Sequence, residues 1–172
     1  MSVVNDLLEF LAESTTPFHA VAAMSRRLVA AGFQELQTID ATQLSAGQGY
    51  FITRNGSSII AFRAAHEPPE KGIRLLGAHT DSPNLSVKPN PVKVRHGVVQ
   101  LSVDVYGGAL LNPWFDRDLS LAGRVNLVNT AGELEGRLVD FQRPLAVIPS
   151  LAIHLDRDAN SSRGINPQRD IL

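Results

Sequence analysis

The sequence contains no cysteine, which excludes both a disulfide framework and a thiolate metal site. It also lacks an excess of either charge: 16 basic residues face 17 acidic ones, so nucleic acid or an anionic membrane is not an expected partner. No long apolar run occurs, because Asp6 and Glu9 interrupt the first apolar residues, and neither a signal peptide nor a membrane span is expected. These absences favour a reducing, cytoplasmic location and leave His, Asp and Glu as the candidate metal ligands.

The chain is nevertheless rich enough in apolar residues to form a core. Apolar residues make up 44% of the 172 positions and charged residues 19%, which is typical of a globular protein of one or two domains. Apolar residues at helical spacing predict a helix over residues 3–13. Thr16 is a suitable N-cap and Pro17 a suitable first residue for a second helix, and Gly32 suits its C-terminal end.

Strand signals follow the two helices. The runs Tyr50–Arg54 and Ser57–Arg63 flank Asn55-Gly56, which predicts a β-hairpin. Ile73–Ala78 is a short apolar run that predicts a buried strand, and the two prolines within Lys88–Gly97 predict a linker between domains. Beyond it the pattern is entirely β, with strands expected at Val99–Val105, Leu119–Val128, Glu133–Phe141 and Ala146–Leu155.

This order predicts that residues 1–87 are the opening of an α/β domain and that the rest of the chain is mainly β. An α/β sheet normally continues with further strand–helix units, whereas this chain changes to β structure and then stops. We therefore expect the chain to be part of a longer protein.

The strongest candidate site is the triplet His79-Thr80-Asp81. Side chains two residues apart on a strand share a face, so His79 and Asp81 are expected to project together from the end of the Ile73–Ala78 strand. A neutral imidazole is a common zinc ligand, and a nearby carboxylate can fix its tautomer or bind metal itself. The alternative is that both residues merely cap a strand, and a catalytic zinc generally needs three protein ligands.

Two further positions carry weaker signals. The triplet Asp116-Arg117-Asp118 is either part of a binding surface or an ion-paired turn, and its composition favours the turn. His154 alternates with Leu151, Ile153 and Leu155, so in a strand it would face away from them and be exposed or at an interface.

Six segments of the chain together resemble the aspartyl aminopeptidase family of zinc metallo-aminopeptidases. They occur in the same order as in that family and span nearly the whole sequence. The segments are Thr16–Val21, Tyr50–Asn55, Gly77–Pro83, Tyr106–Gly108, Trp114–Leu119 with Leu121–Val125, and Ile148-Pro149 with Leu151–Leu155.

The resemblance implies an enzyme that releases N-terminal residues, preferably Asp or Glu, from peptides with the help of two zinc ions. It implies a catalytic α/β domain built on a mixed sheet, of which residues 1–88 resemble the first part. Residues 89–172 resemble the first part of an inserted β-rich domain that serves dimerisation and closes the site. Members of the family form large homo-oligomers, usually dodecamers.

Roles for individual residues also come from the resemblance. His79 resembles the first zinc ligand, Asp81 the carboxylate that supports it, and His154 a histidine that binds substrate in a neighbouring subunit's site. The family's other ligands include a Glu-Glu pair, which this sequence lacks. The expected function is therefore that of a zinc aminopeptidase of which this chain is an incomplete, inactive part. The alternatives are a non-enzymatic assembly fragment that uses Val99–Val105, or a different metal hydrolase built around His79 and Asp81.

Overall fold

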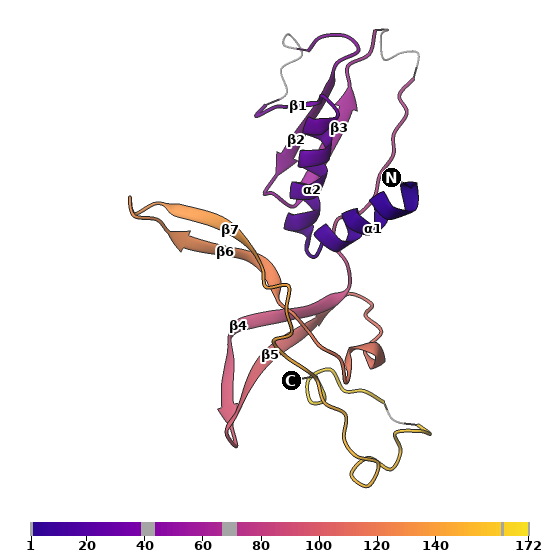
Figure 1. Cartoon of the computed structure of the whole chain (residues 1–172), viewed down its shortest axis with the longest axis vertical. Coiled ribbons are helices and arrows are strands. Elements are labelled where there is room, and N and C mark those ends of the chain that lie inside the picture. Colours follow the sequence, from indigo (N-terminus) through magenta and orange to yellow (C-terminus); the bar gives the residue numbers. More distant parts are fainter. Residues whose placement is uncertain (1, 39–43, 67–71, 163, 172) are drawn as a thin grey trace. The chain divides into compact units, whose positions relative to one another are not determined.

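The computed structural model describes residues 2–38, 44–66, 72–162 and 164–171 (Figure 1). The chain forms two compact units: unit 1 contains Met1–Asp81 and Ala122–Asp140, and unit 2 contains Ser82–Leu121 and Phe141–Leu172. Each unit is described by itself below. The division of the sequence at residues 88 and 89 into a catalytic and an inserted domain stays a prediction.

Two helices open unit 1, as the sequence predicts. Helix α1 spans Val3–Glu13 and helix α2 spans Pro17–Ala30. The hydroxyl of Thr16 accepts a hydrogen bond from the backbone N–H of His19 at 3.3 Å, which satisfies a donor that the first helical turn leaves unpaired. Gly32, with φ of 81°, follows the end of α2 in the left-handed conformation that glycine adopts most readily.

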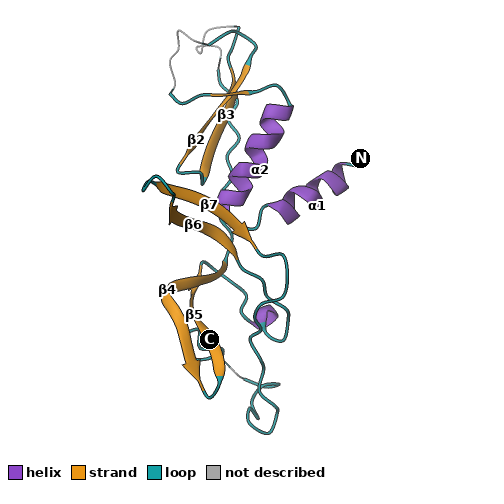
Figure 2. Cartoon of the chain, turned by 60° about the vertical axis from the view of Figure 1, so that its left-hand side comes forward, coloured by secondary structure: helices purple, strands orange, loops and turns teal. Residues whose placement is uncertain are grey.

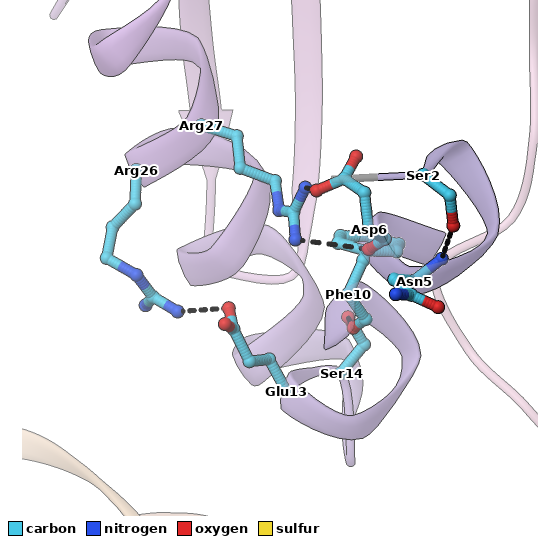
Figure 3. Close-up of polar contacts among 8 residues, drawn as sticks. All are labelled: Ser2, Asn5, Asp6, Phe10, Glu13, Ser14, Arg26 and Arg27. Atoms are coloured by element: carbon cyan, nitrogen blue, oxygen red, sulfur yellow. Dashed lines mark hydrogen bonds and ion pairs between the residues drawn. The ribbon is translucent and has the colours of Figure 1, made fainter. Parts of the chain in front are cut away.

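Charged side chains join α1 to α2 (Figure 3). Arg27 of α2 donates to the carboxylate of Asp6, and Arg26 Nη2 lies 2.8 Å from Glu13 Oε2. The hydrogen bond to Asp6 raises the pKa of Arg27, and the Arg27 guanidinium also lies 5.4 Å from the centre of the Phe10 ring. The two ion pairs hold the side chains of α1 against α2. Because these groups are solvent-exposed, the pairs add little to the free energy of unfolding.

Helix α2 packs against a three-stranded mixed sheet (Figure 1). Strand β1 (Gln34–Glu35) is parallel to β2 (Gly49–Arg54), and β2 is antiparallel to β3 (Ser58–Arg63). The turn between β2 and β3 has positive φ at both Asn55 and Gly56, as expected for this dipeptide. The buried apolar core of this unit comes from α2 and β2: Ala20, Val21, Ala23, Tyr50, Phe51 and Ile52.

The hairpin of β6 (Ala122–Val128) and β7 (Leu134–Asp140) completes unit 1. Arg124 of β6 connects it to the rest of the unit. Its guanidinium carbon lies 4.1 Å from the centre of the Phe18 ring in the first turn of α2, and its Nη1 donates to the carbonyl oxygen of Asn55 at 2.7 Å. One side chain thus joins β6, α2 and the β2–β3 turn.

Arg124→Ala is expected to lower the free energy of unfolding by about 1–2 kcal/mol, because it removes a cation–π contact and a charged hydrogen bond. Chemical denaturation of the chain, with amide exchange at Asn55 and Phe18, would measure the loss. Arg124→Lys is the matched control, since it keeps the charge but not the planar group that stacks on Phe18. Equal stability of all three proteins would contradict this account.

In unit 2, β4 (Asn84–Arg95) and β5 (Val98–Tyr106) form an antiparallel hairpin. The expected linker at Lys88–Gly97 is therefore wrong, since most of it lies within β4. The register shifts between Val87 and Val92, and Asn90 within this bulge has φ of 53°. A bulge tolerates proline, which cannot donate to a ladder, and so Pro89 and Pro91 interrupt the pairing without ending the strand.

The described helices are α1, α2 and the short η3 (Asn112–Trp114) (Figure 2). Two other segments that were expected to be strands differ in the structure. Ala146–Leu155 forms only isolated bridges, Phe115 with Ile148 and Leu119 with Ala146. Ile73–Ala78 is irregular and exposed, with Leu75 at 92% and Leu76 at 99%. Among the described residues no strand pairs with 73–78, and an apolar run becomes a buried strand only between neighbours. Within the described ranges, no helix has the length and apolar character needed to cross a membrane.

Candidate metal centre

The structure brings His79 and Asp81 together, although the residues before them form no strand. His79 Nδ1 lies 2.7 Å from the backbone carbonyl oxygen of Asp81 and 3.3 Å from its carboxylate oxygen Oδ1. The His79 side chain is 77% exposed and that of Asp81 44%. The imidazole is thus oriented on one side and open on the other.

This contact determines the tautomer of His79. A backbone carbonyl oxygen can only accept a hydrogen bond, so Nδ1 must be the protonated ring nitrogen. In the neutral ring Nε2 then carries the lone pair, and Nε2 points away from the hydrogen bond that Nδ1 makes. That arrangement matches the donor that zinc takes from a histidine held by an acceptor on its other nitrogen.

Thr80 fixes the position of the triplet within unit 1. Its hydroxyl donates to the carbonyl oxygen of Ser57 at 2.8 Å, at the start of the β3 side of the hairpin. The chain between His79 and Asp81 is therefore tied to the ordered β2–β3 turn even though the run before it is exposed. In the triplet, Asp81 thus contacts the imidazole of His79, and Thr80 attaches the segment to the β2–β3 turn.

A complete metal site needs more donors than this. Within the described ranges, no group of three or more His, Asp or Glu side chains is arranged to hold a metal ion. His79 and Asp81 fit one zinc ligand with its supporting acceptor, and a catalytic zinc takes three protein ligands and keeps one position open. The described residues by themselves therefore do not form a complete metal site.

His154 lies in unit 2, in a turn closed by hydrogen bonds from Leu155 N and Asp156 N to the carbonyl oxygen of Ala152, at 2.8 and 3.2 Å. The strand expected there is wrong, but the expected exposure of His154 is confirmed. Leu151, Ile153 and Leu155 are also exposed, so alternation does not separate them from His154.

Sequence reasoning underestimated Asp116. This residue has φ of 54°, and its Oδ1 accepts a hydrogen bond from the backbone N–H of Ser150 at 2.8 Å. The side-chain and backbone hydrogen bonds from Ser150 hold the pKa of Asp116 below its usual range. The turn is thus stabilised by a long-range hydrogen bond, which the sequence alone does not reveal.

Unit 1 also has a shallow cleft with a volume of about 260 Å³. Phe18, Glu35, Thr53 and Arg124 are among its lining residues, whereas His79 and Asp81 are not. Its largest side chains already contact one another through the Arg124 and Phe18 pair. We therefore place the candidate chemistry at His79 and not in this cleft.

The sequence matches the family model described as aminopeptidase I zinc metalloprotease (M18) over residues 10–172. The chain belongs to the M18 family. Among curated relatives of this M18 chain is the probable M18 family aminopeptidase 2 of Pseudomonas aeruginosa (strain UCBPP-PA14), 57% identical over 166 residues. The corresponding protein of Pseudomonas savastanoi pv. phaseolicola (strain 1448A / Race 6) is 55% identical over 168 residues.

Solved structures agree with this assignment. A chain in the cryo-EM structure of the Ape4 and Nbr1 complex is 43% identical and superposes with a TM-score of 0.90, covering 96% of this M18 chain and 32% of that chain. Chaetomium thermophilum mApe1 is 40% identical with a TM-score of 0.82, covering 88% of this chain and 35% of that one. The mixed α/β fold therefore matches M18 aminopeptidase structures over about a third of their length.

The M18 chain is much shorter than its relatives. The match to the Pseudomonas aeruginosa protein covers 96% of this chain but only 38% of that protein. The match to the Pseudomonas savastanoi protein covers 97% of this chain and 39% of that protein. The relation to zinc metalloproteases extends over nearly all of the sequence, while most of a relative's length has no counterpart in it.

Proposed function

We propose that this chain supplies the N-terminal part of a zinc aminopeptidase that releases acidic N-terminal residues from peptides, and that the chain alone is inactive. The observation that carries the proposal is the exposed His79 imidazole, whose Nδ1 is held by the Asp81 carbonyl oxygen in a chain of a zinc metalloprotease family. The inactivity is proposed because the described residues offer one ligand of a site that needs several.

In the proposed enzyme, His79 would bind zinc through Nε2, while Asp81 accepts the hydrogen bond from Nδ1–H and so orients the imidazole. When bound, a pair of zinc ions polarises the scissile carbonyl and lowers the pKa of a water toward neutrality. Thr80 contributes indirectly, since its hydrogen bond to Ser57 resists displacement of the triplet from the β2–β3 turn. The general base and the remaining ligands would come from the part of the enzyme beyond this match, which covers 38% of the Pseudomonas aeruginosa relative.

We further propose that residues 1–88 belong to a catalytic domain and residues 89–172 to an inserted domain that mediates dimerisation within a dodecamer. Several large apolar side chains of the β4–β5 hairpin are exposed in the chain by itself, which supports a role in subunit contacts: Val92, Val94, Val98 and Val99. In this arrangement His154 reaches the substrate of a neighbouring subunit from its exposed turn.

The test compares the chain with a chimaeric enzyme, in which residues 1–172 are joined to the part of the Pseudomonas aeruginosa relative that follows its matched region. We expect the zinc-loaded chimaera to release Asp from Asp-peptides at least about tenfold faster than Leu from matched Leu-peptides. We expect the chain alone to release neither. Liberated amino acid is measured with and without a chelator, and size-exclusion chromatography reports the oligomer.

Each part of the proposal has its own contrary result. A folded, zinc-loaded chimaera without aminopeptidase activity would overturn the enzyme assignment, and equal rates on both peptides would overturn the acidic preference. Chelator-sensitive release of aspartate by the chain alone would overturn its inactivity. A chimaera that stays monomeric at full activity would overturn the proposed assembly.

A further inference from the structure

Two segments of unit 2 that are distant in sequence are held side by side. The backbone N–H of Leu119 donates to the carbonyl oxygen of Ala146 at 2.9 Å, and that of Ala146 donates back to Leu119 at 3.1 Å. Further along, Asp116 N donates to the carbonyl oxygen of Ile148 at 2.9 Å, and Ile148 is one of the few buried apolar residues of this unit. Residues 145–148 are therefore fixed mainly by backbone contacts.

Beyond Ile148 the contact passes to a side chain. Asp116 Oδ1 accepts from the backbone N–H of Ser150 at 2.8 Å, and hydrogen bonding by Ser150 lowers the pKa of Asp116. A charged carboxylate forms a stronger hydrogen bond than a neutral acceptor does. The positive φ of Asp116, 54°, is a conformation that few residues other than Gly, Asn and Asp adopt readily.

Ser150 is also where the attached segment ends. The next residues form the turn from Ala152 to Asp156, which is held by its own short-range hydrogen bonds and exposes His154. A turn of this kind keeps its internal shape, and its direction depends on the residues that hold its two ends. Asp156, at the far end, is half-buried, and Ser150, just before the turn, is held by Asp116.

We propose that Asp116 is a positioning residue for His154: by binding Ser150 it sets the direction of the turn that presents this histidine. This inference rests on the proposed function, because the role of His154 in binding substrate is part of that proposal. It assigns to Asp116 a task that a merely ion-paired turn would not have, because the carboxylate acts on a residue 34 positions further along the chain.

The variants separate the carboxylate from the backbone conformation. Asp116→Gly keeps access to positive φ but removes the acceptor, whereas Asp116→Asn keeps both the conformation and an acceptor oxygen. In the chimaeric enzyme, Asp116→Gly is expected to lower kcat/KM by about 10- to 100-fold, mainly through KM, because a misdirected binding group costs orientation. Asp116→Asn is expected to retain activity within about threefold.

Two further measurements distinguish positioning from general damage. In the chain alone, NMR of the Asp116→Gly variant should show loss of hydrogen-exchange protection at the Ser150 amide, with protection retained at Leu119 and Ala146. In the chimaera, adding Asp116→Gly to His154→Ala should cause no further loss of kcat/KM, because Asp116 acts through His154.

The inference is overturned if the Ser150 amide is unaffected by Asp116→Gly, or if Leu119 and Ala146 lose protection equally. It is also overturned if the double variant Asp116→Gly/His154→Ala loses kcat/KM by the product of the two single losses. The failure of the proposed function has a different signature: His154→Ala alone would then leave kcat/KM unchanged, while the exchange result at Ser150 would stand.

Discussion

Replacing His79 with alanine in the chimaeric enzyme is expected to abolish zinc-dependent aminopeptidase activity, with a loss on the order of 10³-fold or more in kcat. Metal-ion catalysis supplies several kcal/mol of stabilisation to the transition state, and about 1.4 kcal/mol corresponds to a factor of ten. Because His79 would supply one zinc ligand through Nε2, and the described residues hold no group of three or more possible ligands, its loss should empty the site. The measurement is kcat together with zinc content by atomic absorption after dialysis.

Two controls make the result specific to the proposed ligand. His96→Asn removes a histidine from the β4–β5 turn, where φ is 51° and asparagine is well tolerated, and it should leave both zinc content and kcat unchanged. Asp81→Asn keeps the backbone carbonyl that accepts the hydrogen bond from Nδ1–H, so its loss of zinc affinity should stay within about 10- to 100-fold. Full activity and full zinc content in His79→Ala would exclude His79 as a ligand.

Local structure could be predicted from the sequence wherever neighbouring residues determine it. Thr16 and Pro17 begin α2, and Asn55-Gly56 forms the turn between β2 and β3, because capping and turn formation involve only a few adjacent residues. The pairing of His79 with Asp81 could be predicted for the same reason, although a backbone carbonyl makes the shorter contact.

Predictions failed where distant residues decide the outcome. The run at Ile73–Ala78 has the composition of a buried strand, yet burial requires neighbouring strands, and among the described residues none pairs with it. The linker expected around Pro89 and Pro91 ignored a bulge, whose register is set by the partner strand β5. The hydrogen bond from Ser150 to Asp116 joins residues too far apart in sequence for any local pattern to reveal it.

Mutating His154 is expected to cause a large loss of activity, and mixing two inactive variants should restore part of that activity. His154→Ala in the chimaera should lower kcat/KM by about 10²-fold or more, because the loss of a group that binds and orients the substrate costs that much. Neither His79→Ala nor His154→Ala subunits are active alone. In a dimer of one of each, however, the site that keeps His79 receives His154 from the other subunit, if the exposed turn acts across the interface.

Equal mixing with free exchange makes half of the dimers mixed, and each mixed dimer has one intact site, so about a quarter of wild-type activity should return. If His154 instead served its own subunit, every site would lack one of the two histidines and no activity would return. The matched control mixes His154→Ala with the double variant His79→Ala/His154→Ala, which cannot form an intact site under either arrangement. Recovery is therefore evidence about the interface itself, since both mixtures contain the same fold, the same zinc and the same total protein.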